Sequence, residues 1–130
     1  MSDLSSTMSA SASGMAAQAS RLRLVSENIA NVDTPGFQRK TVSFEAVSEM
    51  FDNAGTVQTG RVQLSSAERP QVFDPGHPLA DENGYYQGSN VDLMVEIADA
   101  REAQRSYEAN LRMFDQSRQM AASVLDLLKR

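Results

Sequence analysis

His77 is the one histidine of the chain and therefore the first residue to consider as a catalytic base. It lies in the run Asp74-Pro75-Gly76-His77-Pro78, where Asp74, His77 and one of the many serines could in principle form a Ser-His-Asp triad. The sequence has no Gly-x-Ser-x-Gly elbow to present such a serine, and the Asp and His share one turn rich in Pro and Gly. We therefore interpret this run as a turn whose side chains cap their own backbone, and we expect no catalytic residue.

The carboxylates of Asp81-Glu82-Asn83-Gly84 are the next candidates, because this run looks like part of a calcium-binding loop. The alternating ligands and the terminal glutamate of an EF-hand are missing. The chain also has no cysteine, which excludes disulfides, thiolate catalysis and cysteine-bound zinc. It contains no Walker loop and no dinucleotide-binding fingerprint. We therefore expect neither a metal nor a cofactor.

Charge and hydropathy narrow the choice of partners. The formal net charge of −5 disfavours binding to nucleic acid or to anionic lipid, which both attract basic surfaces. No stretch of about 18 apolar residues could span a membrane. The first residues, Met1-Ser2-Asp3-Leu4, lack the basic and apolar segments of a cleaved secretory signal. We expect no nucleic acid, no membrane insertion and no cleaved signal peptide.

Proline and glycine divide the 130 residues into three regions. Residues 1–31 predict an N-terminal helix. Residues 32–89 hold all four prolines and six of the seven glycines, which predicts loops and short strands, one of them over residues 61–64. Residues 90–130 contain neither Pro nor Gly and predict one long helix. The expected fold is mainly α, with long N- and C-terminal helices pairing as a coiled coil around a small irregular or β middle region.

The first region carries apolar residues seven apart, which is the spacing of a helical seam. They are Met8, Met15, Leu22 and Ile29. Small residues lie between them, so the seam buries little area, and Gly14 and several serines lower the helix propensity further. This helix alone in water should fray, and we expect it to need a partner.

The last region carries a longer seam of the same kind, expected to begin at an N-cap on Ser89 or Asn90. Its members are Leu93, Ile97, Ala100, Tyr107, Leu111, Phe114, Ala121, Leu125 and Leu128. A helix of about 39 residues spans about 58 Å, against about 43 Å for the N-terminal helix. Since a compact globule of this length has a radius of gyration of only about 14 Å, the helix must project. We expect an elongated subunit whose neighbours cover the rest of the apolar stripe; a monomeric two-helix hairpin is the alternative.

The segment Asn28 to Phe37 predicts a helix end followed by a sharp change of direction. Asn31 suits the left-handed conformation that closes a helix, and the amide of Asn28 could satisfy carbonyl groups freed there. Pro35 and Gly36 fit the central positions of a type II turn that follows Thr34. The segment is either an ordinary helix-to-loop boundary or a fixed elbow between an assembly helix and an outer domain.

These residues also carry a resemblance. Asn28 to Phe37 reads Asn-Ile-Ala-Asn-x-x-Thr-Pro-Gly-aromatic, which resembles the signature of flagellar rod and hook proteins. The run Asp74 to Pro78, followed by Gly84-Tyr85 and Asn90-Val91, is similar to the proximal rod proteins of the FlgC type. The run Ser106 to Asn110 is similar to that family as well. One departure is Ser89, where the family usually has proline.

The resemblance implies a structural subunit of the flagellar basal-body rod, a drive shaft that spans the periplasm and transmits motor torque. It implies that the terminal helices polymerise with other copies and other rod proteins. It also implies export through the flagellar type III apparatus without a cleaved signal. The alternatives are another rod subunit, a soluble helical adaptor that binds a partner helix, or a hydrolase based on His77.

Overall fold

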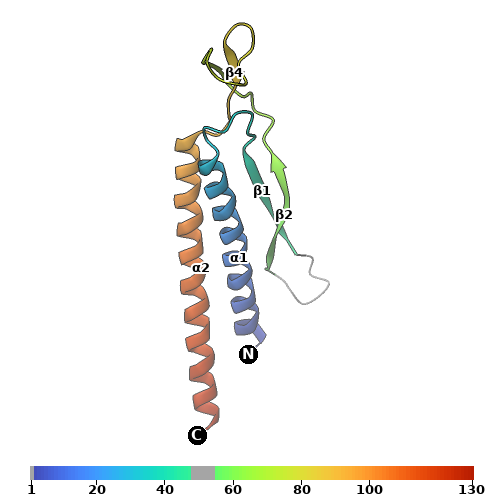
Figure 1. Ribbon diagram of the computed structural model, residues 1–130. Helices are drawn as coiled ribbons and strands as arrows, with labels where there is room; N and C mark the ends of the chain where they lie inside the picture. The colour runs from blue at the N-terminus through green and yellow to red at the C-terminus, as the bar shows by residue number, and fades with distance from the viewer. Residues whose placement is uncertain (1, 48–54) are drawn as a thin grey trace.

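The computed structural model describes residues 2–47 and 55–130; Met1 and residues 48–54, inside the expected N-terminal and middle regions, lie outside the described residues. Two long helices and two small antiparallel sheets make up the fold, so the expected mainly α architecture is confirmed (Figure 1). The elements are α1 (Ser2–Ala30), β1 (Lys40–Ala46), β2 (Val57–Leu64), β3 (Gln71–Phe73), β4 (Tyr85–Gln87) and α2 (Leu93–Leu128).

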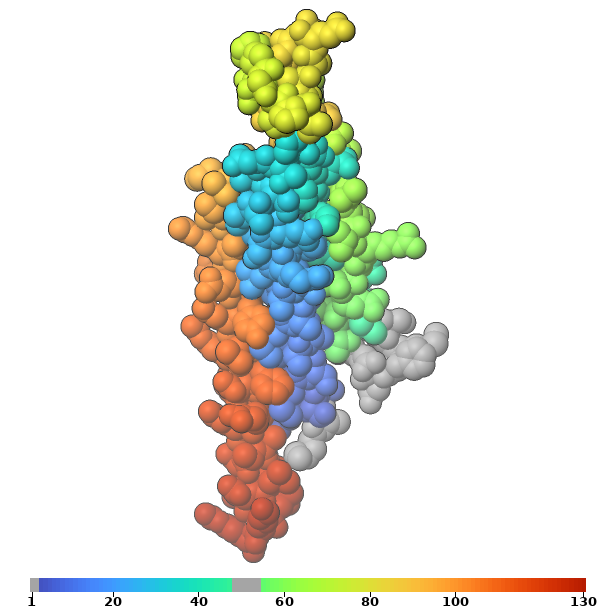
Figure 2. All heavy atoms as spheres, in the orientation of Figure 1, coloured from blue at the N-terminus to red at the C-terminus, as the bar shows by residue number. Residues whose placement is uncertain are grey.

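The two helices lie side by side and run in opposite directions, with both chain ends at the same end of the molecule (Figure 1). Because α2 has 36 residues and α1 has 29, the C-terminal end of α2 extends beyond α1. Figure 2 shows this free end projecting below the N-terminal helix. The described helices include none that is both long enough and apolar enough to cross a membrane.

Small side chains let α1 and α2 approach closely. The buried apolar residues are few: Ala17, Leu24 and Val25 on α1, and Ala103 on α2. At Gly14 the approach is so close that an added Cβ would lie 2.7 Å from Nδ2 of Asn110. The pair therefore has a narrow core of small residues, and much of its apolar surface faces outward.

The middle region forms a hairpin and a small head. Strands β1 and β2 pair antiparallel beside α1, and β2 contains the strand predicted over residues 61–64 (Figure 1). Strands β3 and β4 pair in a head at the end of the molecule opposite the chain termini (Figure 1). In the head the rings of Phe73 and Tyr85 pack with centroids 5.1 Å apart.

Helix α2 begins later than expected, and the predicted N-cap was wrong. Asp92 is the N-cap, and its carboxylate accepts a hydrogen bond from the backbone N–H of Met94 at 3.0 Å. Ser89 instead accepts from the N–H of Val91 within a local turn. The side chain of Asn90 is occupied by contacts to other segments, which leaves the cap to Asp92.

The type II turn predicted after α1 is confirmed. The N–H of Phe37 donates to the carbonyl of Thr34 at 3.2 Å, which closes the turn around Pro35 and Gly36. Gly36 has φ of +73°, the left-handed value that the third position of such a turn requires.

This geometry predicts the effect of two substitutions at Gly36. Replacement by Val should lower the free energy of unfolding by about 1–3 kcal/mol, because a β-branched side chain resists positive φ. Replacement by Asn should cost clearly less, since Asn tolerates this conformation. Urea denaturation of the purified variants measures both, and equal losses for Val and Asn would show that φ does not limit this position.

Candidate functional site

The helix end and the turn after it are joined by side chains of the Asn28–Phe37 segment. The amide Nδ2 of Asn31 donates to the carbonyl of Glu27 at 2.8 Å and so satisfies a carbonyl in the last turn of α1. The carboxamide oxygen of the same residue accepts from the hydroxyl of Thr34 at 3.0 Å. Asn31 therefore closes the helix and anchors the turn, which supports a fixed elbow.

Asn28 has a different role from the one predicted. Its side chain does not serve the freed carbonyls of α1 but pairs with the backbone of Lys40 at the start of β1. The N–H of Lys40 donates to Oδ1 at 2.9 Å, and Nδ2 donates to the carbonyl of Lys40 at 2.8 Å. The side-chain amide of Asn28 thus makes the same pair of hydrogen bonds with Lys40 that a residue of an adjacent strand would make, and Asn28 is only 1% exposed. These two hydrogen bonds join α1 to β1.

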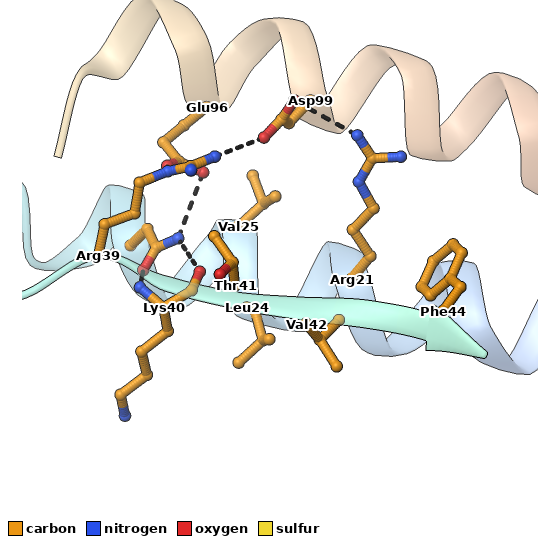
Figure 3. A pocket seen from close by; sticks show the side chains of 11 residues that line it. Arg21, Leu24, Val25, Arg39, Lys40, Thr41, Val42, Phe44, Glu96 and Asp99 are labelled. Atoms are coloured by element: carbon orange, nitrogen blue, oxygen red, sulfur yellow. Dashed lines mark hydrogen bonds and ion pairs between the residues drawn. The ribbon is translucent and has the colours of Figure 1, made fainter. Parts of the chain in front are cut away.

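A group of charged side chains continues from Asn28 across to α2, and we call Asn28, Arg39, Glu96, Asp99 and Arg21 the elbow cluster. Nδ2 of Asn28 also donates to Glu96 at 3.3 Å. Arg39 bridges two carboxylates, with Nε on Glu96 and Nη2 on Asp99 at 2.6 Å (Figure 3). Arg21 reaches the other oxygen of Asp99 at 3.3 Å. The cluster therefore connects α1, the segment before β1, and α2.

Burial makes this cluster energetically important. Glu96 is 0% exposed, and a buried carboxylate without partners costs several kcal/mol. Here one oxygen accepts from the guanidinium of Arg39 and the other from the amide of Asn28. An open cavity of about 300 Å³ lies beside these residues and is lined by the cluster together with Leu24 and Val25 (Figure 3). Since its charges are paired with one another, the cavity is suited to positioning the helices rather than to chemistry.

The segments of the head and those next to it are joined to the elbow by hydrogen bonds to backbone groups of Gly36 and Arg39. The N–H of Gly36 donates to the carbonyl of Gln87 in β4 at 3.0 Å, and Arg69 donates to the carbonyl of Gly36 at 2.8 Å. Asn90 accepts from the N–H of Arg39 at 2.6 Å. The elbow thus joins the head to the helix pair through several independent hydrogen bonds.

The motif around His77 forms the tip of the head. Nδ1 of His77 accepts from the N–H of Leu79 at 3.1 Å, and its ring stacks on Tyr86 with centroids 4.0 Å apart. The N–H of Asp74 donates to the carbonyl of Gly84 at 2.8 Å. There is no room for a side chain at Gly84, because an added Cβ would lie 2.9 Å from Pro75. The turn interpretation therefore agrees with the geometry, and Gly76, Pro78 and Tyr85 complete the same tip.

In the acidic run of residues 81–84, which resembles part of a calcium loop, the carboxylate of Asp81 accepts hydrogen bonds from nearby backbone groups. Oδ1 of Asp81 accepts from the backbone N–H groups of Asn83 and Tyr85, at 2.9 and 3.0 Å. Within residues 2–47 and 55–130, no group of three or more His, Cys, Asp or Glu side chains is arranged to hold a metal ion.

The predicted seams flank the contact between α1 and α2 instead of forming its centre. Met8, Met15, Leu22 and Ile29 are half-buried, as are Ala100, Tyr107, Phe114 and Ala121. Five seam residues of α2 are exposed: Leu93, Ile97, Leu111, Leu125 and Leu128. The centre of the contact on α2 is a parallel row, also with a spacing of seven, that was not predicted: Glu96, Ala103, Asn110 and Ser117.

Sequence reasoning also missed Arg21, Arg39 and Asp99 as cluster members. The sequence did contain one indication of the cluster. In the row Glu96, Ala103, Asn110 and Ser117, Glu96 carries a charge, whereas the other three side chains are small or carry an amide. A charge in such a row calls for a partner from another element.

The cluster predicts a large difference between two glutamates that contact the same region. Glu96→Ala should lower the free energy of unfolding by up to about 3 kcal/mol, because it removes the buried carboxylate that Arg39 and Asn28 share and leaves Arg39 with Asp99 as its partner. Glu102→Ala removes an exposed partner of Arg21 and should cost no more than about 1 kcal/mol. Urea denaturation of both variants gives the comparison, and similar losses would contradict the role assigned to Glu96.

Comparison with known proteins agrees with this architecture. Residues 8–38 match a family profile described as flagella basal body rod protein, and residues 82–127 match one described as flagellar basal body rod FlgEFG protein C-terminal. The flagellar basal-body rod protein FlgC of Agrobacterium fabrum is 41% identical, covering 99% of this chain and 98% of the relative. FlgC of Aquifex aeolicus is 35% identical over 99% of this chain and 100% of the relative. FlgC of Salmonella typhimurium is 34% identical over 88% and 90%. The chain therefore belongs to the FlgC family of flagellar basal-body rod proteins and is a structural subunit of the rod, not an enzyme.

Proposed function

We propose that this subunit builds the rod by polymerising through its two terminal helices, with the free end of α2 as the main contact to neighbouring subunits. The observation that carries the proposal is the apolar surface left uncovered on α2. Beyond α1, the exposed apolar residues include Val124, Leu125, Leu127 and Leu128, and Leu128 is 74% exposed. A soluble monomer rarely presents so continuous an apolar surface unless a partner covers it.

The energetics favour assembly over monomer stability for these side chains. Burying one Leu or Phe is worth roughly 1.5–3 kcal/mol. In a polymer the same contact recurs at every subunit, so several leucines on one free helix end amount to a strong association. The free end contributes little to the monomer, because no part of α1 reaches it (Figure 2). Partners of this kind are further copies and other rod proteins of related sequence.

Membership of the rod-protein family supports a more detailed proposal for where the subunit acts. We infer that the subunit spans part of the periplasm in the rod, transmits motor torque, and reaches that position through the flagellar type III export apparatus without a cleaved signal. Two features support this. The narrow core of small residues between α1 and α2 suits a chain that must unfold for passage. The elbow cluster and the turn contacts join head and helices rigidly, as transmission of torque requires.

A double substitution tests the role of the free end. Leu125→Asp combined with Leu128→Asp should abolish swimming and stop rod growth, while synthesis and export continue. Both side chains are exposed, at 47% and 74%, so the monomer should melt close to the wild-type temperature. Swimming in soft agar, isolated basal bodies and thermal melting of the purified chain are the three measurements.

The matched control is Gln116→Asp combined with Gln119→Asp, which adds the same charge at exposed polar positions with the same spacing. We expect the control to swim. A swimming Leu125/Leu128 double variant would refute the proposal. So would a double variant whose monomer is strongly destabilised, because the two leucines would then belong to the monomer core.

A further inference from the structure

We propose that the contact of Glu96 with Asn28 and Arg39 sets the axial register of α1 against α2. Asn28 bonds both Lys40 at the start of β1 and Glu96 on α2. Arg39 reaches the same carboxylate from the segment before β1 (Figure 3). The proposal concerns which turns of the two helices face each other, and it does not depend on how the subunit polymerises.

The remainder of the helix contact specifies register only weakly. On α2 the central row consists of Ala103, Asn110 and Ser117 beyond Glu96, and these side chains are small or flexible. On α1 the buried positions away from the cluster are Ser11 and Ala17, while the larger Leu24 and Val25 line the cavity beside it. Rows of small residues that repeat every seven positions present nearly the same surface after a shift of seven. Side-chain volume therefore selects one alignment only weakly, through the close fit of Gly14 against Asn110.

A specific alternative alignment can be named. In the structure Gly14 faces Asn110, Arg21 lies beside Asp99 and Glu102, and Asn28 faces Glu96. If α2 slid by seven residues toward the N-terminus of α1, Gly14 would face Ala103 and Arg21 would face Glu96. Glycine against alanine is sterically acceptable, and the arginine could pair with the carboxylate. The alignment of α1 and α2 shifted by seven residues could therefore compete with the observed alignment.

Only the observed register gives Glu96 both of its partners. Asn28 cannot shift independently, because its amide is held by two hydrogen bonds to the backbone of Lys40. Arg39 is likewise held on the hairpin side, because its carbonyl accepts from the N–H of Ser65 at 2.7 Å and the adjacent Lys40 is bound to Asn28. Glu96 can accept from both Asn28 and Arg39 only when it lies beside them along the axis of the helix pair. This resembles the buried polar residues that fix alignment in coiled coils at some cost in stability.

The register matters because it sets the position of the free end. A shift of seven residues moves α2 along the axis by about 10 Å. Leu125 and Leu128 would move by the same distance relative to the head. A subunit that had slipped would present its exposed apolar residues at the wrong level to any neighbour.

The test is a distance measurement between spin labels, which the chain permits because it has no native cysteine. Arg23→Cys on α1 and Gln119→Cys on α2 place both labels at exposed positions outside the cluster. Pulsed electron paramagnetic resonance on the full-length labelled chain should give one narrow distance. Adding Arg39→Ala, which leaves Glu96 free to pair with Arg21, should produce a second population about 10 Å longer.

The control is Glu102→Ala, which removes an exposed ion pair on the same helix and should keep the single distance. A single unchanged distance in the Arg39→Ala chain would overturn the proposal. A broad distribution in that chain would overturn it too, because the cluster would then hold the helices together without choosing their alignment. A broad distribution in the chain with intact cluster would show that the register is not set within the subunit.

Discussion

The buried carboxylate of Glu96 is the constraint on which the rest of this structure depends. It has no contact with solvent, so it must be stabilised by groups of the chain itself. These groups come from separate segments: the guanidinium of Arg39 just before β1 supplies the opposite charge, and the amide of Asn28 at the end of α1 donates a hydrogen bond. Asn28 also carries two hydrogen bonds to the backbone of Lys40, which extends the same contact into the hairpin. One buried charge thereby holds together the helix pair, the elbow and the start of the sheet.

Outside the cluster, the helix pair is held by a narrow line of small residues, and this explains the distribution of apolar surface. Gly14 and Ala103 permit a close approach but bury little area. The larger side chains, among them Leu111 and Leu125, consequently remain exposed on α2. A rod subunit has a use for this arrangement, because neighbouring subunits can complete a core that the single chain leaves unfinished. In the account proposed above, the elbow cluster aligns the two helices within the subunit and the exposed apolar surface of α2 contacts neighbouring subunits.

The sequence predicted those features whose cause is local and missed those whose cause is tertiary. The turn at Pro35 and Gly36 follows from backbone preferences of the two residues, so it could be predicted. The long helices could be predicted from the seven-residue apolar spacing and from the absence of proline, with glycine absent from α2 as well. The cap at Asp92 could not be chosen from sequence, because Ser89 and Asn90 are equally good caps and only the fold commits Asn90 to Arg39. The partner of Asn28 was missed because Lys40 reaches it only after the chain reverses. Glu96 was missed because a charge is normally expected at the surface.

The central claim is that the subunit aligns its own helices internally and leaves the free end of α2 for its neighbours. A cryo-electron microscopy reconstruction of the basal body containing this chain tests it most directly. We expect Asn28 and Glu96 of one subunit to remain in contact within the rod, and Leu125 and Leu128 to be buried against adjacent subunits. A reconstruction in which α1 pairs with α2 of a different subunit, or in which the free end of α2 faces solvent on all sides, would contradict the claim.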